Sequence, residues 1–187
     1  HELAVFAELE RAPEHIHTYR ITQLGLWNAR AAGHTAEDML ETLDRWSRFP
    51  VPPSVSVDLR ETVNRYGRLV IERDDEGVLV LRSTDPAVLA QVANNKRIQP
   101  LLIGHPTPET FIIDAWARGQ IKQELLKIGW PAEDLAGYTP GTPHEIELAQ
   151  EGWSIRPYQQ DAVDAFAADG SGVVVLPCGA GKTIVGA

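Results

Sequence analysis

VVVLPCGAGKTIVGA, from Val173 to Ala187, decides the fold expected at this end of the sequence. Together with Gly172 it begins with an apolar run up to Leu176, which is typical of a buried strand. A loop with two glycines follows, and the residues from Thr183 onward can begin a helix. Strand, glycine loop and helix in this order predict an α/β unit whose loop binds phosphate.

The loop offers the groups that a phosphate ligand needs. Gly181, Lys182 and Thr183 fit the phosphate-loop pattern, although Leu176 stands where the strict pattern has its first glycine. Glycine backbones can turn N–H groups inward around anionic oxygens, and the following helix would add its dipole. Lys182 would contact the terminal phosphates, and Thr183 would ligate Mg²⁺. The alternative is a tight turn with an incidental lysine. The candidate loop comprises Pro177, Cys178, Gly179, Ala180, Gly181, Lys182 and Thr183.

Upstream of the loop, GWSIRPYQQDAVDAF predicts an amphipathic helix. Pro157 stands where the helix would begin, and Val163 and Phe166 continue its apolar face. The amide of Gln159 can donate to and accept from one adenine edge at once. Arg-Pro-Tyr-Gln at this spacing resembles the Q motif of superfamily-two helicases, in which the glutamine reads adenine. An ordinary capped helix is the alternative.

Two pairs of segments carry a wider resemblance. IRPYQ and VVVLPCGAGKT together are similar to the opening of the helicase core in XPB-type DNA repair helicases. TYRITQLGLWNARAAG and LLKIGWPAEDLAGY resemble the N-terminal region of bacterial, particularly actinobacterial, members. The resemblance covers essentially the whole chain, while the ATP motifs are confined to Trp153 through Thr183.

The resemblance implies an ATP-dependent DNA translocase with 3′ to 5′ polarity and two RecA-like domains, acting in DNA repair with ATP and Mg²⁺. It implies that Gln159 reads adenine, that Arg156 neighbours the adenine site, and that Gly179 and Gly181 cradle phosphate. Lys182 would be the phosphate lysine and Thr183 the magnesium ligand.

A strand ending in Asp-Glu, which could hold magnesium and activate water, is not recognisable in the sequence. Asp74-Asp75-Glu76 falls in a predicted hairpin turn, and Glu133-Asp134 follows a helix and a proline. We therefore expect no catalytic residue within the 187 residues and no ATP hydrolysis by this chain alone. We interpret it as an N-terminal piece of a larger helicase that ends just after its first ATP motif.

The first 84 residues predict three helices and a hairpin. Leu24, Trp27 and Ala31 share one helical face, and Thr35 caps a second helix whose apolar face carries Met39, Leu40, Leu43 and Trp46. A third helix runs from about Ser54 to Tyr66, and RLVIER and VLVLRS flank an acidic turn. This order favours a winged helix slightly over another small α+β unit.

Residues 85–136 predict a second small α+β unit, so the chain as a whole is α+β. Asp85 caps a helix, 98–103 and 110–114 are candidate strands, and 118–128 is a helix. Residues 137–146, rich in Gly, Pro and Thr, read as a linker, and 147–187 would begin a truncated RecA-like domain.

The composition limits the partners. A formal net charge of −9 argues against nucleic-acid binding by bulk charge, and a single cysteine excludes an internal disulfide. No apolar run is long enough for a membrane span, and we expect a bacterial cytoplasmic protein. The resemblance implies that the N-terminal half recognises DNA damage or docks a partner, for example a repair nuclease. We favour protein docking, or DNA contact made elsewhere. A stand-alone winged-helix binding module and a phosphate-loop ATPase unrelated to DNA are alternatives. The candidate DNA contacts, with solvated helix faces as their alternative, are Lys96, Arg97, Arg118, Lys122 and Lys127.

Overall fold

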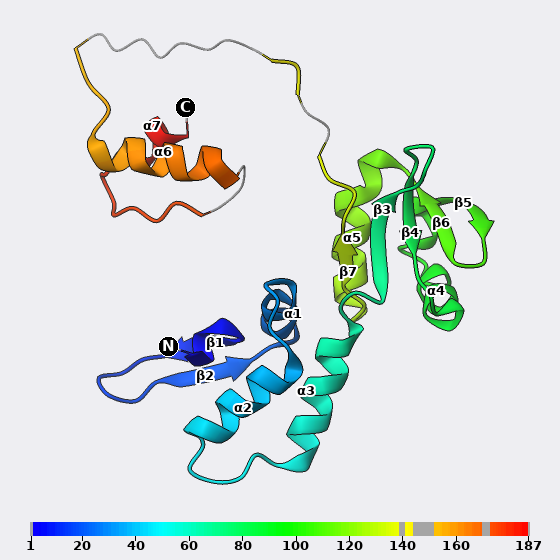
Figure 1. Cartoon of the computed structure of the whole chain (residues 1–187), viewed down its shortest axis with the longest axis horizontal. Helices are drawn as coiled ribbons and strands as arrows, with labels where there is room; N and C mark the ends of the chain where they lie inside the picture. Colours follow the sequence, from blue (N-terminus) through cyan, green and yellow to red (C-terminus); the bar gives the residue numbers. More distant parts are fainter. Residues whose placement is uncertain (1, 139–140, 144–151, 170–172, 187) are drawn as a thin grey trace. The chain divides into compact units, whose positions relative to one another are not determined.

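The computed structural model describes residues 2–138, 141–143, 152–169 and 173–186 (Figure 1). The chain divides into two compact units, His1–Thr139 and Pro140–Ala187. Unit 1 contains two apolar clusters, and unit 2 contains the phosphate-loop sequence. None of the described helices is long and apolar enough to cross a membrane.

The N-terminal part of unit 1 combines a short hairpin with three helices. A 3-10 turn, η1 (Glu2–Val5), precedes strands β1 (Ala7–Arg11) and β2 (Thr18–Ile21), which pair antiparallel. The sequence analysis did not predict this hairpin, whose strands are only four and five residues long and mostly exposed. The helices that follow are α1 (Gln23–Ala31), α2 (Ala36–Trp46) and α3 (Pro53–Arg65).

Helix α1 buries Trp27 as predicted, but not the other two residues predicted on its apolar face. Leu26, Trp27 and Ala29 are buried, whereas Leu24 and Ala31 are exposed. The reason is that α1 contacts both α3 and β1, so its buried face is set by two neighbours. Trp27 Nε1 donates to the carbonyl oxygen of Thr62 at 2.8 Å, which ties α1 to α3.

The predicted cap of α2 is confirmed. Thr35 Oγ1 accepts from the N–H of Asp38, and the carboxylate of Asp38 accepts from the N–H of Thr35, which satisfies two N-terminal donors. Met39 and Leu40 are buried as expected. Trp46 was predicted on the apolar face but is 64% exposed, and its Nε1 donates to Glu2.

The second part of unit 1 is a five-stranded mixed sheet in the order β5-β6-β4-β3-β7 (Figure 1). Only the β3–β7 pair is parallel. The strands and the helices between them are β3 (Leu69–Arg73), β4 (Leu79–Arg82), α4 (Pro86–Ala93), η2 (Gln99–Leu101), β5 (Leu102–Thr107), β6 (Thr110–Ile113), η3 (Ala115–Ala117), α5 (Arg118–Lys127) and β7 (Ala132–Asp134).

One face of this sheet forms the larger core. Leu69 and Ile71 on β3 and Leu79 and Leu81 on β4 point into this core, as the period of a strand requires, while Val80 between the last two is buried outside this cluster. These leucine and isoleucine residues belong to one apolar cluster with side chains of helices α4 and α5. The helix residues in this cluster are Val88, Leu89 and Val92 of α4 and Ile121 and Leu125 of α5.

The winged-helix interpretation is not confirmed. The hairpin β3–β4 exists as predicted, but its apolar side chains belong to the cluster of α4 and α5, while α1–α3 form the other cluster. The boundary predicted after residue 84 lies between β4 and β6, which pair in one sheet. The hairpin is continuous with the later strands because its second edge binds β6 and its first edge binds β7.

The strand predicted over 98–103 begins later. Residues 99–101 form the 3-10 turn η2, and β5 starts at Leu102. Pro100 lacks a backbone N–H and so cannot donate to a strand ladder at this point. The predicted helix over 118–128 and the cap of α4 by Asp85 are confirmed, with Asp85 accepting from the N–H of Ala87 at 3.0 Å.

Unit 2 contains α6 (Pro157–Asp169) and the short α7 (Lys182–Val185). Pro157 begins α6 as predicted. The predicted strand 172–176 is not formed within the described residues, and Gly172 itself lies outside them. Val173 and Val175 are 89% and 86% exposed, because this extended segment has no neighbouring strand in the described part of unit 2. Half of the predicted linker 137–146 also falls outside the described residues.

Candidate phosphate-binding site

The loop between the extended segment and α7 depends on two glycines. Gly179 has φ +79° and Gly181 has φ +76°, both in the left-handed region that other residues adopt only at a cost. A Cβ atom at Gly181 would lie 2.5 Å from Nε2 of Gln159, so the close approach of α6 also requires glycine there. The sequence predicted both glycines as turning points.

The ammonium group of Lys182 lies across the start of the loop. Its Nζ donates to the carbonyl oxygens of Leu176 and Pro177 at 2.9 and 3.1 Å. Within the described residues, the N–H groups of Gly179 and Gly181 donate no hydrogen bond, and the hydroxyl of Thr183 has no partner. An ammonium, two backbone donors and a hydroxyl therefore belong to one short loop.

Helix α7 (Lys182–Val185) follows the loop directly, with Gly181 at its N-cap position. The loop's own N–H groups and the charge of Lys182 are attractions for an anion that the described residues supply. Such a donor set fits a nucleotide phosphate, and the hydroxyl of Thr183 is an oxygen ligand of the type that Mg²⁺ prefers.

Gln159 joins α6 to the loop. Its side chain is buried, with 3% of the residue exposed, and its Nε2 donates to the carbonyl oxygens of Ala180 at 3.0 Å and Gly181 at 3.3 Å. Its Oε1 accepts from the backbone N–H of Arg156 at 2.9 Å. In this structure the Nε2 end of the amide holds the loop and the Oε1 end holds the backbone just before α6, and its role toward adenine stays a prediction.

Tyr158 is a site residue that the sequence analysis missed. Its hydroxyl donates to the carbonyl oxygen of Ala180 at 3.0 Å and accepts from Nη1 of Arg156 at 3.1 Å. The residue lies inside the motif that predicted the site. Its partner is 22 positions further along the chain, however, so spacing alone gave no signal of the contact.

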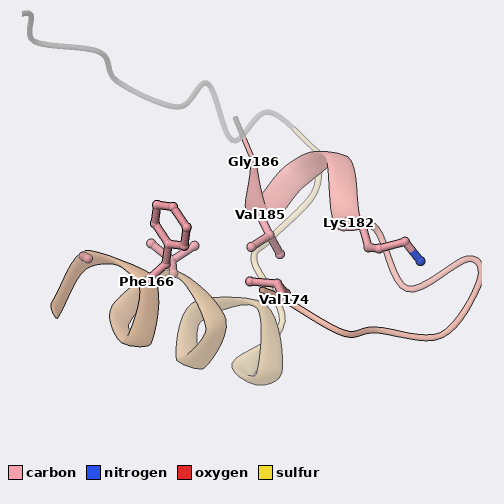
Figure 2. Close-up of a pocket in the computed structure, with 7 residues that line it drawn as sticks. Phe166, Val174, Lys182, Val185 and Gly186 are labelled. Atoms are coloured by element: carbon pink, nitrogen blue, oxygen red, sulfur yellow. The ribbon is translucent and has the colours of Figure 1, made fainter. Parts of the chain in front are cut away.

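A hollow of about 490 Å³ lies between α6 and α7. Figure 2 shows Phe166 of α6, Val185 of α7 and Val174 at its border, with the ammonium of Lys182 directed away from Phe166. Its lining is mainly apolar, so it is unsuited to phosphate. The residues around it are Val163, Phe166, Ala167, Val174, Lys182, Val185 and Gly186.

Residues 1–105 match a family model described as "Helicase conserved C-terminal domain". The chain belongs to this helicase family. It is 60% identical over 185 residues to the DNA 3′-5′ helicase XPB of Kineococcus radiotolerans, which covers 99% of this chain and 33% of that protein.

Other relatives agree with this family. The DNA 3′-5′ helicase XPB of Mycobacterium tuberculosis is 57% identical, over 99% of this chain and 34% of that protein. The general transcription and DNA repair factor IIH helicase/translocase subunit XPB of Schizosaccharomyces pombe is 26% identical, over 98% of this chain and 30% of that protein. The resemblance to XPB-type helicases is thereby confirmed, and this helicase-family chain spans about a third of its relatives' length.

In each of the two acidic segments of this helicase-family chain, one aspartate forms hydrogen bonds or ion pairs within the fold: Asp74 and Asp134. Oδ1 of Asp74 accepts from the N–H groups of Glu76 and Val78 and so closes the hairpin turn. Asp134 ends β7 and is paired with cations. Among the described residues, no group of three or more His, Cys, Asp or Glu side chains could hold a metal ion.

Asp134 is the centre of an ion-pair cluster. It accepts from Nε and Nη2 of Arg118 at 3.0 and 2.7 Å, and from Nζ of Lys122 at 2.8 Å. Burial alone would raise the pKa of Asp134, but the hydrogen bonds from Arg118 and Lys122 outweigh it and the pKa is lowered. Its hydrogen bonds to Asp134 raise the pKa of Arg118.

Glu124 forms ion pairs with two further candidate DNA contacts, Lys127 and Arg97. Its carboxylate binds Nζ of Lys127 at 2.7 Å and lies 3.7 Å from Nη1 of Arg97. The hydrogen bond from Lys127 lowers the pKa of Glu124. Four of the five predicted DNA contacts are thus paired with carboxylates. Lys96 is exposed and forms no ion pair within the described part of the chain.

Proposed function

We propose that this chain is part of an ATP-dependent DNA 3′-5′ helicase that acts in DNA repair, and that its phosphate loop binds ATP. The observation that carries the proposal is the loop itself, in which Gly179 and Gly181 adopt positive φ and Lys182 is joined to the loop's own carbonyls. The identity of 57–60% with proteins named DNA 3′-5′ helicase XPB supports the choice of activity.

The residues of the loop would act by holding charge. Lys182 would leave the carbonyl oxygens of Leu176 and Pro177 and bind phosphate oxygens, an exchange of weak partners for anionic ones. The free N–H groups of Gly179 and Gly181 would bind the same anion, and Thr183 would ligate Mg²⁺. ATP with its Mg²⁺ would supply the phosphoryl group and neutralise its charge.

We propose that residues 147–187 begin the first RecA-like domain. The order of α6, extended segment, phosphate loop and α7 supports this, because a RecA-like domain places its phosphate loop between a strand and a helix. The extended segment would become a central strand when other strands pair with it. The apolar hollow beside Phe166 supports the same view, since it is lined like one side of an unfinished core.

For unit 1 we propose docking of a protein partner, with any DNA contact confined to few residues. Arg118, Lys122, Lys127 and Arg97 are neutralised by nearby carboxylates, and the hairpin turn at Asp74–Gly77 is acidic. A surface that binds DNA through phosphate contacts needs unpaired cations, and such contacts dominate its affinity.

The test of ATP use is Lys182→Ala in the full-length protein, measured as DNA-stimulated ATP turnover. Loss of the one ammonium that would bind the terminal phosphates should lower kcat/KM about 100-fold or more. Arg11→Ala is the control, because it removes an exposed cation that forms no ion pair among the described residues and belongs neither to the loop nor to the candidate DNA contacts. Full turnover by the Lys182 variant would refute the proposed role of the loop.

A further inference from the structure

We propose that Tyr158 is a positioning residue that fixes the direction of a phosphate-binding N–H in the loop; this rests on the proposed nucleotide-binding function. Its hydroxyl links Nη1 of Arg156 to the carbonyl oxygen of Ala180, at 3.1 and 3.0 Å. Ala180 lies between the two glycines with positive φ. One hydroxyl therefore joins the start of α6 to the middle of the loop.

The carbonyl of Ala180 belongs to the same peptide unit as the N–H of Gly181. That unit is planar and trans, so the carbonyl and the N–H point in opposite directions. Tyr158 and Gln159 both donate to the Ala180 oxygen and occupy its two lone pairs. They turn the carbonyl toward α6 and the N–H of Gly181 away from it, and this N–H donates no hydrogen bond within the described residues.

The loop needs such support from outside because its own residues cannot supply it. Gly179 and Gly181 have no side chains to pack, and glycine gives the backbone more freedom than any other residue. Gln159 alone would leave the Ala180 oxygen with one donor. Tyr158 adds a second, and the bond it accepts from the Arg156 guanidinium polarises its hydroxyl and strengthens its donation.

The deciding variant is Tyr158→Phe in the full-length protein. It keeps the ring and removes only the hydroxyl, so both bonds are lost with little change in volume. One hydrogen bond contributes about 0.5–1.5 kcal/mol, which converts to a KM for ATP raised by about 2- to 12-fold. The change in kcat should stay below about twofold, because the loop holds phosphate equally in the ground and transition states.

A competitive inhibitor that lacks the adenine base shows whether Tyr158 positions the phosphate loop or contacts adenine directly. Inorganic tripolyphosphate should lose affinity by the same factor as ADP, because Tyr158 acts through the phosphate loop. Tyr138→Phe is the matched control: Tyr138 is exposed in unit 1, and its hydroxyl forms no hydrogen bond within the described residues. Equal thermal melting by circular dichroism should accompany both variants.

The outcomes distinguish this inference from the proposed function. If Lys182→Ala abolishes turnover while Tyr158→Phe keeps the wild-type KM, the loop binds ATP and the positioning role is wrong. If Tyr158→Phe weakens ADP but not tripolyphosphate, the tyrosine contacts the base and the inference is also wrong. If Lys182→Ala leaves turnover intact, the proposed function fails instead.

Discussion

Replacing Asp134 by Asn should destabilise unit 1 and abolish part of its acid sensitivity. The carboxylate is 12% exposed and accepts hydrogen bonds from Arg118, Lys122 and the N–H of Ala136. A hydrogen bond to a charged group contributes about 1.5–3 kcal/mol when it is well shielded. Lys122 is 41% exposed and Arg118 is 21% exposed, so water screens both partners. We expect a loss of about 2 kcal/mol at pH 7.

The pH dependence of this loss has a definite sign. The pKa of Asp134 is lowered in the folded state, so its ionised form stabilises the fold at pH values above the unfolded pKa of about 3.9. As the pH falls below that value and through the folded pKa, wild-type Asp134 becomes protonated and this stability is lost. The difference between wild type and variant should therefore be constant above about pH 5 and shrink at lower pH.

Urea unfolding of the 187-residue chain, followed by circular dichroism, measures the effect. With a slope of about 2 kcal/mol per molar, a loss of about 2 kcal/mol moves the midpoint by about 1 M. Asp75→Asn is the control, because Asp75 is exposed in the hairpin turn and has no hydrogen bond or ion pair in the described part of the chain. A midpoint for Asp134→Asn equal to that of Asp75→Asn, or a difference that persists undiminished at the lowest pH where the chain folds, would refute the reasoning.

Two further predictions concern the loop and the candidate DNA contacts. Gly181→Ala should raise the KM for ATP of the full-length protein about tenfold or more, since left-handed backbone costs about 1–2 kcal/mol and the new Cβ would meet Gln159 at 2.5 Å. The control is Gly119→Ala, which lies in open space on α5 and should leave the KM unchanged. An unaltered KM for Gly181→Ala would contradict the loop geometry. Lys122→Ala should change the affinity of this chain for labelled forked DNA less than about twofold, because its charge is already paired with Asp134. A salt dependence lowered by about one unit of slope in that titration would show that Lys122 contacts phosphate.

Local signals in the sequence predicted the separate elements well. Thr35 with Asp38, Asp85 before Pro86, and Pro157 at the start of α6 each act on the adjacent turn of backbone. Such effects are short-ranged, so they can be read from neighbouring residues. The hairpin around Asp74–Gly77 belongs to the same class, since a turn and its two flanking strands are contiguous.

Contacts between segments far apart in the sequence could not be predicted from such local signals. The parallel contact of β3 with β7 joins residues about 60 positions apart, and β7 is only three residues long. From the sequence alone, the apolar residues of the β3–β4 hairpin could pack against either the preceding helices or the following ones. Only the folded chain shows that α4 and α5 take them. That choice is why the winged helix predicted from element order is not confirmed.

The sequence by itself determined the candidate phosphate loop, because the backbone freedom of Gly179 and Gly181 and the charge of Lys182 belong to a few neighbouring residues. Tertiary structure alone decided which charges are free and what supports the loop. Arg118 and Lys122 form ion pairs with Asp134 only once β7 lies beside α5, and Tyr158 reaches Ala180 only once α6 folds back on the loop. The reason is that an ion pair or a hydrogen bond depends on distance in space, which a linear spacing of residues does not specify.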